Sequence, residues 1–220
     1  MSCDEPFIRE LTGYITSELL MALGLPPGSL IWQLISLWVR RPLAKFSLLA
    51  AEFDHLLNEG GFQAAACWFN NQFVDHTDCW GVDMLPRRGP LLVVANHPGA
   101  YDSLVIAGHL PRNDLKIISS PIPFLGKLPV TRTHLIFSAP DISARMRAVR
   151  KAIEHLKAGG ALLLFARGRI DPDPAWMTGA EEGIACWSSS PALFLKRVPD
   201  TRLVISIISG ILAPQFLNHP

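Results

Sequence analysis

The residues of this chain best suited to chemistry are His97 and Asp102, in the run Asn-His-Pro-Gly-Ala-Tyr-Asp at residues 96–102. A neutral imidazole can accept a proton from a substrate hydroxyl, and a neighbouring carboxylate orients the ring and stabilises the imidazolium that forms. Within one helix, five residues turn through about 500°, which would place the two side chains on different faces. They can meet if His97 lies in a loop and Asp102 begins the next helix, and Pro98 and Gly99 favour such a loop.

The same residues also have a purely structural explanation. Asp102 could be the N-cap of a helix that begins at Ser103, with His97 a polar residue at a strand end. The preceding apolar run, Pro90-Leu-Leu-Val-Val-Ala95, is typical of a buried strand. Ligands bind at the carboxyl ends of strands in open α/β sheets, and this run would place His97 there. The position therefore favours a catalytic pair.

The elements that must position this pair follow residue 75, where short apolar runs alternate with helical patterns. This alternation is typical of the α/β class, and we predict a mostly parallel central sheet flanked by helices. We predict strands at Asp78–Val82, Leu91–Ala95, Leu115–Ser119, His134–Phe137, Ala161–Phe165 and Leu203–Ser209. We predict helices at Ser103–Leu110, Ser143–Ala158 and Gly179–Lys196, the last in two pieces around Pro191. The buried stripe of the middle helix is expected to comprise Met146, Val149, Ile153 and Leu156.

Residues 1–75 are predicted to be an N-terminal helical segment, packed as one unit with the α/β domain of residues 76–220. Ser29 is a candidate N-cap, and Pro42 is expected to start a new helix that ends at Gly60-Gly61. A further helix is expected at Phe62–Phe73.

An uncharged stretch, Leu19–Val39, is long enough to span a bilayer, but Pro26-Pro27-Gly28 divides it into halves that are too short. Two explanations remain open for these halves. They can pack on the protein core, or they can lie on a membrane surface. In the second case the interfacial tryptophans and the cations near lipid headgroups would be Trp32, Trp38, Arg40, Arg41 and Lys45.

Composition narrows the functional classes. A net charge of +1 argues against a nucleic-acid-binding protein that works through bulk electrostatics. The cysteines are scattered without a Cys-x-x-Cys pair, which indicates reduced thiols and no zinc knuckle: Cys3, Cys67, Cys79 and Cys186. Acidic residues near the N-terminus argue against a cleaved signal peptide. Histidines outside the pair lack metal-ligand spacing, so no metal site is expected.

The arrangement Asn-His-x-x-x-x-Asp after an apolar strand resembles the first signature block of the glycerolipid acyltransferases. This family comprises the 1-acylglycerol-3-phosphate and glycerol-3-phosphate acyltransferases. The resemblance implies that His97 is the general base that deprotonates the acceptor hydroxyl, which then attacks an acyl thioester. It implies that Asp102 orients His97, and Asn96 is expected to help bind substrate.

The second block of that family resembles Gly126-Lys-Leu-Pro-Val-Thr-Arg132, about 30 residues further along the chain. The resemblance gives Arg132 the task of binding the acceptor phosphate, for which a planar guanidinium is suited. The alternative is that Arg132 is a solvated loop residue.

The third block, Phe-Pro-Glu-Gly-Thr-Arg in the family, is altered here to Phe165-Ala-Arg-Gly-Arg-Ile170. Arg167 stands at the Glu position and Arg169 at the Thr position, while Gly168 is kept. Two arginines that flank a glycine at a strand end can form an anion site, so these three residues are also expected to bind substrate. A solvated turn is the alternative.

The resemblance thus implies an acyltransferase of the phospholipid-synthesis type. The donor would be acyl-CoA or an acyl carrier protein thioester, and the acceptor a lysophospholipid or glycerol phosphate. No metal and no tightly bound cofactor are expected, and the protein is expected at the cytoplasmic side of a membrane, peripheral or interfacial. Two alternatives remain: a non-catalytic lipid-binding relative, suggested by Arg167, and an acyl-thioester hydrolase in which the same pair activates water.

Overall fold

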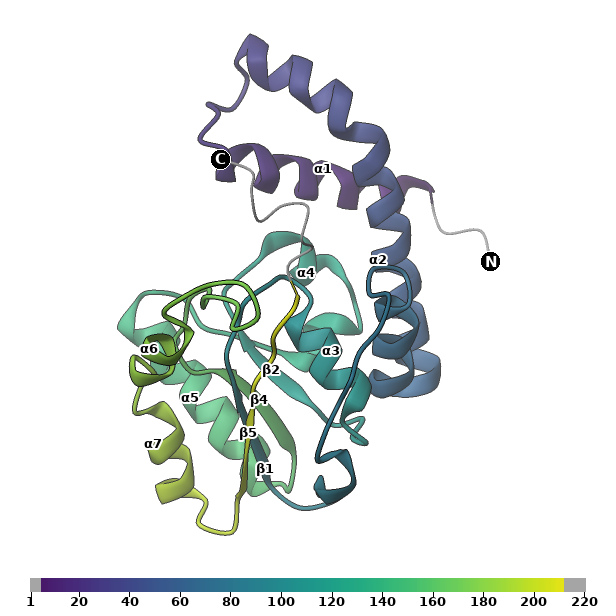
Figure 1. The fold of residues 1–220 in the computed structure, drawn as a ribbon. Coiled ribbons are helices and arrows are strands. Elements are labelled where there is room, and N and C mark those ends of the chain that lie inside the picture. Colours follow the sequence, from purple (N-terminus) through teal and green to yellow (C-terminus); the bar gives the residue numbers. More distant parts are fainter. Residues whose placement is uncertain (1–4, 212–220) are drawn as a thin grey trace.

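A parallel five-stranded sheet forms the centre of the fold (Figure 1). The computed structural model describes residues 5–211, so Cys3 lies outside the described residues. The strands follow the order β3-β2-β4-β1-β5, and each pairing is parallel. Their bounds are β1 Leu91–Ala95, β2 Lys116–Ser119, β3 Leu135–Phe137, β4 Ala161–Phe165 and β5 Arg202–Ser206. The predicted α/β class with a parallel sheet is therefore confirmed.

Helices cover both faces of the sheet (Figure 1). One face packs against α2 (Leu30–Asn70) and α3 (Asp102–His109), and the other against α5 (Ile142–Lys157) and α7 (Ser190–Arg197). Shorter elements connect these: α4 (Pro123–Lys127), α6 (Ala180–Ala185) and the 3-10 helices η1 (Val82–Met84) and η2 (Thr131–His134). The predicted division of the last helical region around Pro191 corresponds to α6 and α7.

Strand β1 is buried along its whole length because both of its sides are covered. Leu91, Val93 and Ala95 belong to the core on the α2–α3 face, whereas Leu92 and Val94 belong to the core on the α5–α7 face. A strand covered on two faces needs a continuous apolar run, which is the pattern that this sequence shows. The loop that carries the catalytic pair therefore leaves from a fully packed strand.

The N-terminal segment forms a helical hairpin of α1 (Glu5–Ala22) and α2, which projects from the domain in Figure 1. Ser29 caps α2, since its hydroxyl accepts a hydrogen bond from the Trp32 N–H at 3.1 Å. The chain breaks helical geometry at Gly61, with φ 79° and ψ 178°, as the glycine pair predicts. Within residues 5–211, no helix combines the length and the apolar character needed to cross a membrane.

Pro42 does not start a new helix, contrary to the sequence-based expectation, but lies inside α2. A proline removes one backbone donor, and a helix can continue through it where tertiary packing compensates for the lost hydrogen bond. Beyond Pro42, the helix packs on α1 through Ala50 and Ala51, which share a core cluster with Leu11. The hydroxyl of Thr12 also donates to the Ser47 hydroxyl at 3.0 Å.

Two further expectations are wrong. Residues 78–82 form no strand: Trp80 is 86% exposed and Gly81 has a φ of 80°, so this segment has no apolar face to bury and turns directly into η1. In α5 the expectation fails at Met146, which is 58% exposed, whereas Leu156 is buried and Val149 and Ile153 pack partly buried against the core as predicted. At 100° per residue, Met146 lies about 80° around the helix from Leu156, at the margin of the buried side that Ala148 and Ala152 complete.

Candidate active site

His97 and Asp102 are in direct contact at the carboxyl end of β1. The Nδ1–H of His97 donates a hydrogen bond to Oδ2 of Asp102 at 2.7 Å, and the Asp102 side chain is fully buried. The same oxygen accepts the Gly99 N–H at 2.9 Å. Asp102 is the first residue of α3 and makes no cap for it, since the N-cap position is Tyr101 and carries no side-chain cap hydrogen bond. The carboxylate thus faces back toward the loop rather than its own helix.

The His97 ring is held in a defined orientation. It stacks on Phe165 of β4, with ring centroids 4.1 Å apart and an interplanar angle of 17°. Because an ionised carboxylate can only accept a hydrogen bond, Nδ1 carries the ring proton, and the neutral ring has its free lone pair on Nε2. The His97 side chain is 26% exposed, so a substrate can reach the ring. The arrangement can therefore act as a general base through Nε2.

The backbone of His97 is also fixed, by a residue that sequence reasoning missed. The His97 N–H donates to Oδ2 of Asp171 at 2.8 Å, and the Asp171 N–H donates to the His97 carbonyl at 2.9 Å. The Asp171 side chain is only 4% exposed. The sequence does signal a rigid turn here through the run Asp171-Pro-Asp-Pro174. It does not signal that Asp171 binds the backbone of His97.

Arg167 is committed to contacts within the protein. Its Nη1 donates to the carboxylate of Asp171 at 3.3 Å and to the Ile170 carbonyl at 3.1 Å, and its side chain is 16% exposed. The charge of this predicted anion ligand is therefore largely balanced by Asp171. An incoming phosphate would have to compete with that carboxylate.

Gly168 and Arg169 lie at the same edge of the sheet as His97, because β4 pairs directly with β1. Both are exposed, and Gly168 has a φ of 72°, a conformation that suits glycine in a tight turn. The Gly168 N–H donates to the Phe165 carbonyl at 3.1 Å. Within residues 5–211, the Arg169 side chain has no recorded hydrogen bond or ion pair. Arg169 is thus the predicted arginine that remains accessible beside the catalytic pair.

Asn96 links the end of β1 to the segment after β5 through its side chain. Its amide donates to the Ile208 carbonyl and accepts the Ile208 N–H, both at 2.7 Å, and it is 3% exposed. These bonds join the end of β1 to the segment after β5. Because both functional ends of the side chain are used, Asn96 is placed to support the loop rather than to touch a substrate.

The structure does not bring Arg132 to His97. Arg132 precedes β3, at the amino end of the parallel strands, whereas His97 follows the carboxyl end of β1. The register Leu135–Ile117–Leu163–Val93 puts three strand spacings between them, and strand geometry gives a Cα separation on the order of 20 Å. An arginine side chain cannot cover that distance. The second predicted block therefore does not contribute its arginine to this site.

Among residues 5–211, no group of three or more histidine, cysteine or acidic side chains is arranged to hold a metal ion. Residues 76–185, half of the chain, match the family model described as Acyltransferase. No curated protein and no solved structure matches. The matched region spans β1 to α6 and contains both His97 and Asp102. The family model covers half of the chain, which shows that this protein is an acyltransferase with an acyl donor and a lipid acceptor as substrates. This protein therefore belongs to the family of glycerolipid acyltransferases.

Proposed function

We propose that this protein transfers a fatty acyl group from an acyl thioester to a hydroxyl of a glycerophosphate-like lipid. The observation that carries the proposal is the 2.7 Å hydrogen bond between His97 Nδ1 and the fully buried Asp102 carboxylate. This bond leaves Nε2 as the proton acceptor on a ring that is fixed on one side by Phe165.

In the proposed reaction, His97 Nε2 takes the proton of the acceptor hydroxyl as its oxygen bonds to the thioester carbonyl carbon. Asp102 stabilises the imidazolium while the tetrahedral intermediate exists. The C–S bond then breaks, and the imidazolium returns its proton to the departing thiolate. The products are an ester and a free thiol, so His97 ends as it began, and no metal or tightly bound cofactor is required.

The acceptor phosphate is assigned to Arg169, next to Gly168. Arg169 is exposed at the catalytic edge of the sheet, whereas Arg167 is paired with Asp171 and Arg132 lies at the opposite edge. A guanidinium can bind a phosphate in a bidentate manner, which would hold the nearby hydroxyl toward Nε2.

The protein offers an apolar surface beside the catalytic loop that can bind the acyl chain. Tyr101 adjoins Asp102 and stacks on Phe73, with ring centroids 4.9 Å apart and an interplanar angle of 17°. Phe73 is 40% exposed, and burial raises the pKa of the Tyr101 hydroxyl. We assign this pair to the part of the site that receives the acyl chain, because large aromatic faces supply apolar contact area.

The hairpin tip supports a membrane-surface location. Its exposed apolar side chains include Leu23, Leu30, Ile31, Leu34, Leu37 and Trp38. Arg40, Arg41 and Lys45 are exposed further along α2, while Trp32 is half-buried. The carboxyl edge of the sheet faces this hairpin, because α1 contacts α4 through Glu18 and the Phe124 N–H at 2.8 Å. We propose peripheral binding at the cytoplasmic face, where reduced thiols such as the unpaired Cys67 persist.

The test is an acyl-transfer assay with purified full-length protein. Acyl-CoA and acyl carrier protein thioesters would be offered with lysophosphatidate, glycerol 3-phosphate or an unphosphorylated monoacylglycerol. We expect transfer to a phosphorylated acceptor, and we expect His97→Ala to abolish it. His109→Ala is the matched control, since His109 hydrogen-bonds Thr77 at the other end of α3.

Each alternative predicts a different product. A thioester hydrolase would release free fatty acid at the same rate with and without acceptor. A non-catalytic lipid-binding relative would bind lysophosphatidate and form no ester with any donor. Either result, or full activity in His97→Ala, would contradict the proposed transfer mechanism.

A further inference from the structure

We infer that the amino edge of the sheet holds a second anion-binding site, separate from the catalytic one, formed by Lys116, Arg132 and Lys151. These side chains line a single surface hollow of about 490 Å³. The site would take a phosphate-bearing small molecule as its ligand. It goes beyond the proposed function, because the hollow lies at the edge of the sheet opposite to His97.

Three separate elements bring the cations to the hollow. Lys116 is the first residue of β2, Arg132 lies in η2 and Lys151 lies on α5. Within residues 5–211, none of these three side chains has a recorded hydrogen bond or ion pair, so their charges are not balanced by a bonded partner. Glu154 also lines the hollow. Three cations against one carboxylate leave an excess of positive charge, which a bound anion would offset.

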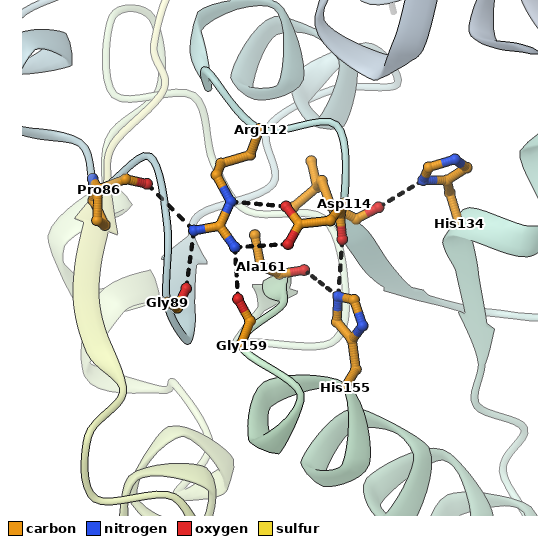
Figure 2. Close-up of polar contacts among 9 residues, drawn as sticks. Pro86, Gly89, Arg112, Asp114, His134, His155, Gly159 and Ala161 are labelled. Carbon is orange, nitrogen blue, oxygen red and sulfur yellow. Dashed lines mark hydrogen bonds and ion pairs between the residues drawn. The ribbon is translucent and has the colours of Figure 1, made fainter.

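His155 also lines the hollow. Hydrogen bonds to two backbone carbonyls hold its ring in place (Figure 2). Its Nε2 lies 2.9 Å from the carbonyl oxygens of both Asp114 and Ala161, so Nε2 carries the proton that it donates to them. Burial, together with the charge of Lys116, lowers the pKa of His155. The ring is therefore a neutral wall, and the excess charge comes from the three cations.

The neighbouring Arg112 is a scaffold and not a ligand for the anion. Its guanidinium is 4% exposed and donates to both carboxylate oxygens of Asp114 at 2.7 Å (Figure 2). It also donates to the carbonyls of Pro86, Gly89 and Gly159. Because all of its donors are directed at protein acceptors, it fixes the loop that holds His155 in place.

The ligand class follows from the volume of the hollow and the charges that line it. Two ammonium groups and one guanidinium suit the several oxygens of a phosphomonoester or diphosphate. A volume of about 490 Å³ lies within the range of small-molecule sites. A free phosphate compound and a lipid headgroup share this chemistry, so the experiment must distinguish them.

Calorimetric titration of the full chain with inorganic pyrophosphate at low ionic strength tests the inference. We expect saturable binding that Arg132→Gln and Lys151→Gln each weaken by at least about tenfold, since each removes one charge-assisted contact. Arg145→Gln is the matched control. Arg145 is exposed and lies on α5, as Lys151 does, but it does not line the hollow. It should change the affinity by less than about twofold.

A second arm uses vesicles of phosphatidylcholine with and without phosphatidate. If the ligand is a lipid headgroup, Arg132→Gln will reduce binding to phosphatidate vesicles, and pyrophosphate will compete with them. Absence of saturable binding to both probes, or binding that neither substitution weakens, would overturn the inference. His97→Ala should bind pyrophosphate normally, so failure of the catalytic proposal can be told apart from failure of this one.

Discussion

Asp171 and His97 are joined by two hydrogen bonds that run in opposite directions. The carboxylate of Asp171 accepts the His97 N–H at 2.8 Å, and the Asp171 N–H donates to the His97 carbonyl at 2.9 Å. The loop after β4 thereby fixes the backbone of the proposed base. Arg167 balances the charge of Asp171 from the position where the family pattern has a glutamate. The altered third block therefore supports the site even though its first arginine is not free to bind a substrate.

This relationship predicts that Arg167 and Asp171 are energetically coupled. We expect Asp171→Ala to lower the free energy of unfolding by about 2–4 kcal/mol, because it leaves the mostly buried Arg167 guanidinium without a counter-charge. In an Arg167→Ala background, the same substitution should cost clearly less. Urea denaturation of the wild type, both single variants and the double variant measures the coupling. Strictly additive losses would show that the ion pair has no role in holding the loop.

A second prediction concerns the charge of Asp102. Because the Gly99 N–H points at Oδ2, an asparagine at this position will present its carbonyl oxygen there and still accept from His97. Asp102→Asn should therefore preserve the ring orientation but remove the charge that stabilises the imidazolium. We expect kcat to fall by roughly 100-fold with little change in KM for the acceptor, and Asp102→Leu to lose roughly 10,000-fold.

Steady-state kinetics and thermal unfolding of both variants test this prediction. If Asp102→Asn is as inactive as Asp102→Leu while both remain folded, the carboxylate acts through its charge alone. If Asp102→Asn retains full activity, the carboxylate acts through orientation alone, and the proposed stabilisation of the imidazolium by its charge is wrong.

Much of the fold could be predicted because local sequence and tertiary packing agree. Strand β1 matches its predicted bounds, since a strand buried on both faces must be uniformly apolar. Ser29 and Gly61 act as local signals whose effect does not depend on distant residues. Pro42 failed as a signal because α1 packs against the following turns of α2, and such long-range packing is not visible in a local pattern.

The candidate site was predictable only within the segment that forms it. His97 and Asp102 lie five residues apart, so one loop suffices to bring them together. Arg132 was placed by a motif match, but the register of three strands puts it at the other edge of the sheet. Asp171 was missed because its partner is 74 residues away, at a distance that only the sheet topology determines.

A third prediction concerns the hairpin tip. Leu34 and Trp38 are 68% and 84% exposed, and burial of such a side chain in an apolar phase contributes about 1.5–3 kcal/mol. We expect Leu34→Glu with Trp38→Glu to reduce binding to anionic vesicles by at least about 100-fold in a flotation assay. Trp80→Glu is the control, as Trp80 is equally exposed but lies outside the hairpin. An equal loss of vesicle binding in the hairpin variant and in Trp80→Glu would show that membrane binding depends on general surface hydrophobicity and not on the hairpin.

The last prediction is a pH dependence of stability that comes from Arg112 and Asp114. The hydrogen-bonded guanidinium of Arg112 lowers the pKa of the Asp114 carboxyl below its ordinary value (Figure 2). A carboxyl whose pKa is lower in the folded state stabilises the fold above its unfolded-state pKa, near 4, and loses this contribution as the pH falls through the folded-state pKa. Asp114→Asn should therefore be less stable than the wild type at pH 7, and the difference should shrink below about pH 4.

Urea denaturation of both proteins between pH 7 and pH 3 measures this difference. Asp78→Asn serves as the control, because Asp78 forms an exposed pair with His76, and exposed pairs contribute little. The variant of Asp78 should follow the wild type across the range. A gap between wild type and Asp114→Asn that stays constant down to pH 3 would mean that Asp114 contributes through packing or hydrogen-bond shape, because a contribution from its charge must vanish once the carboxyl is protonated.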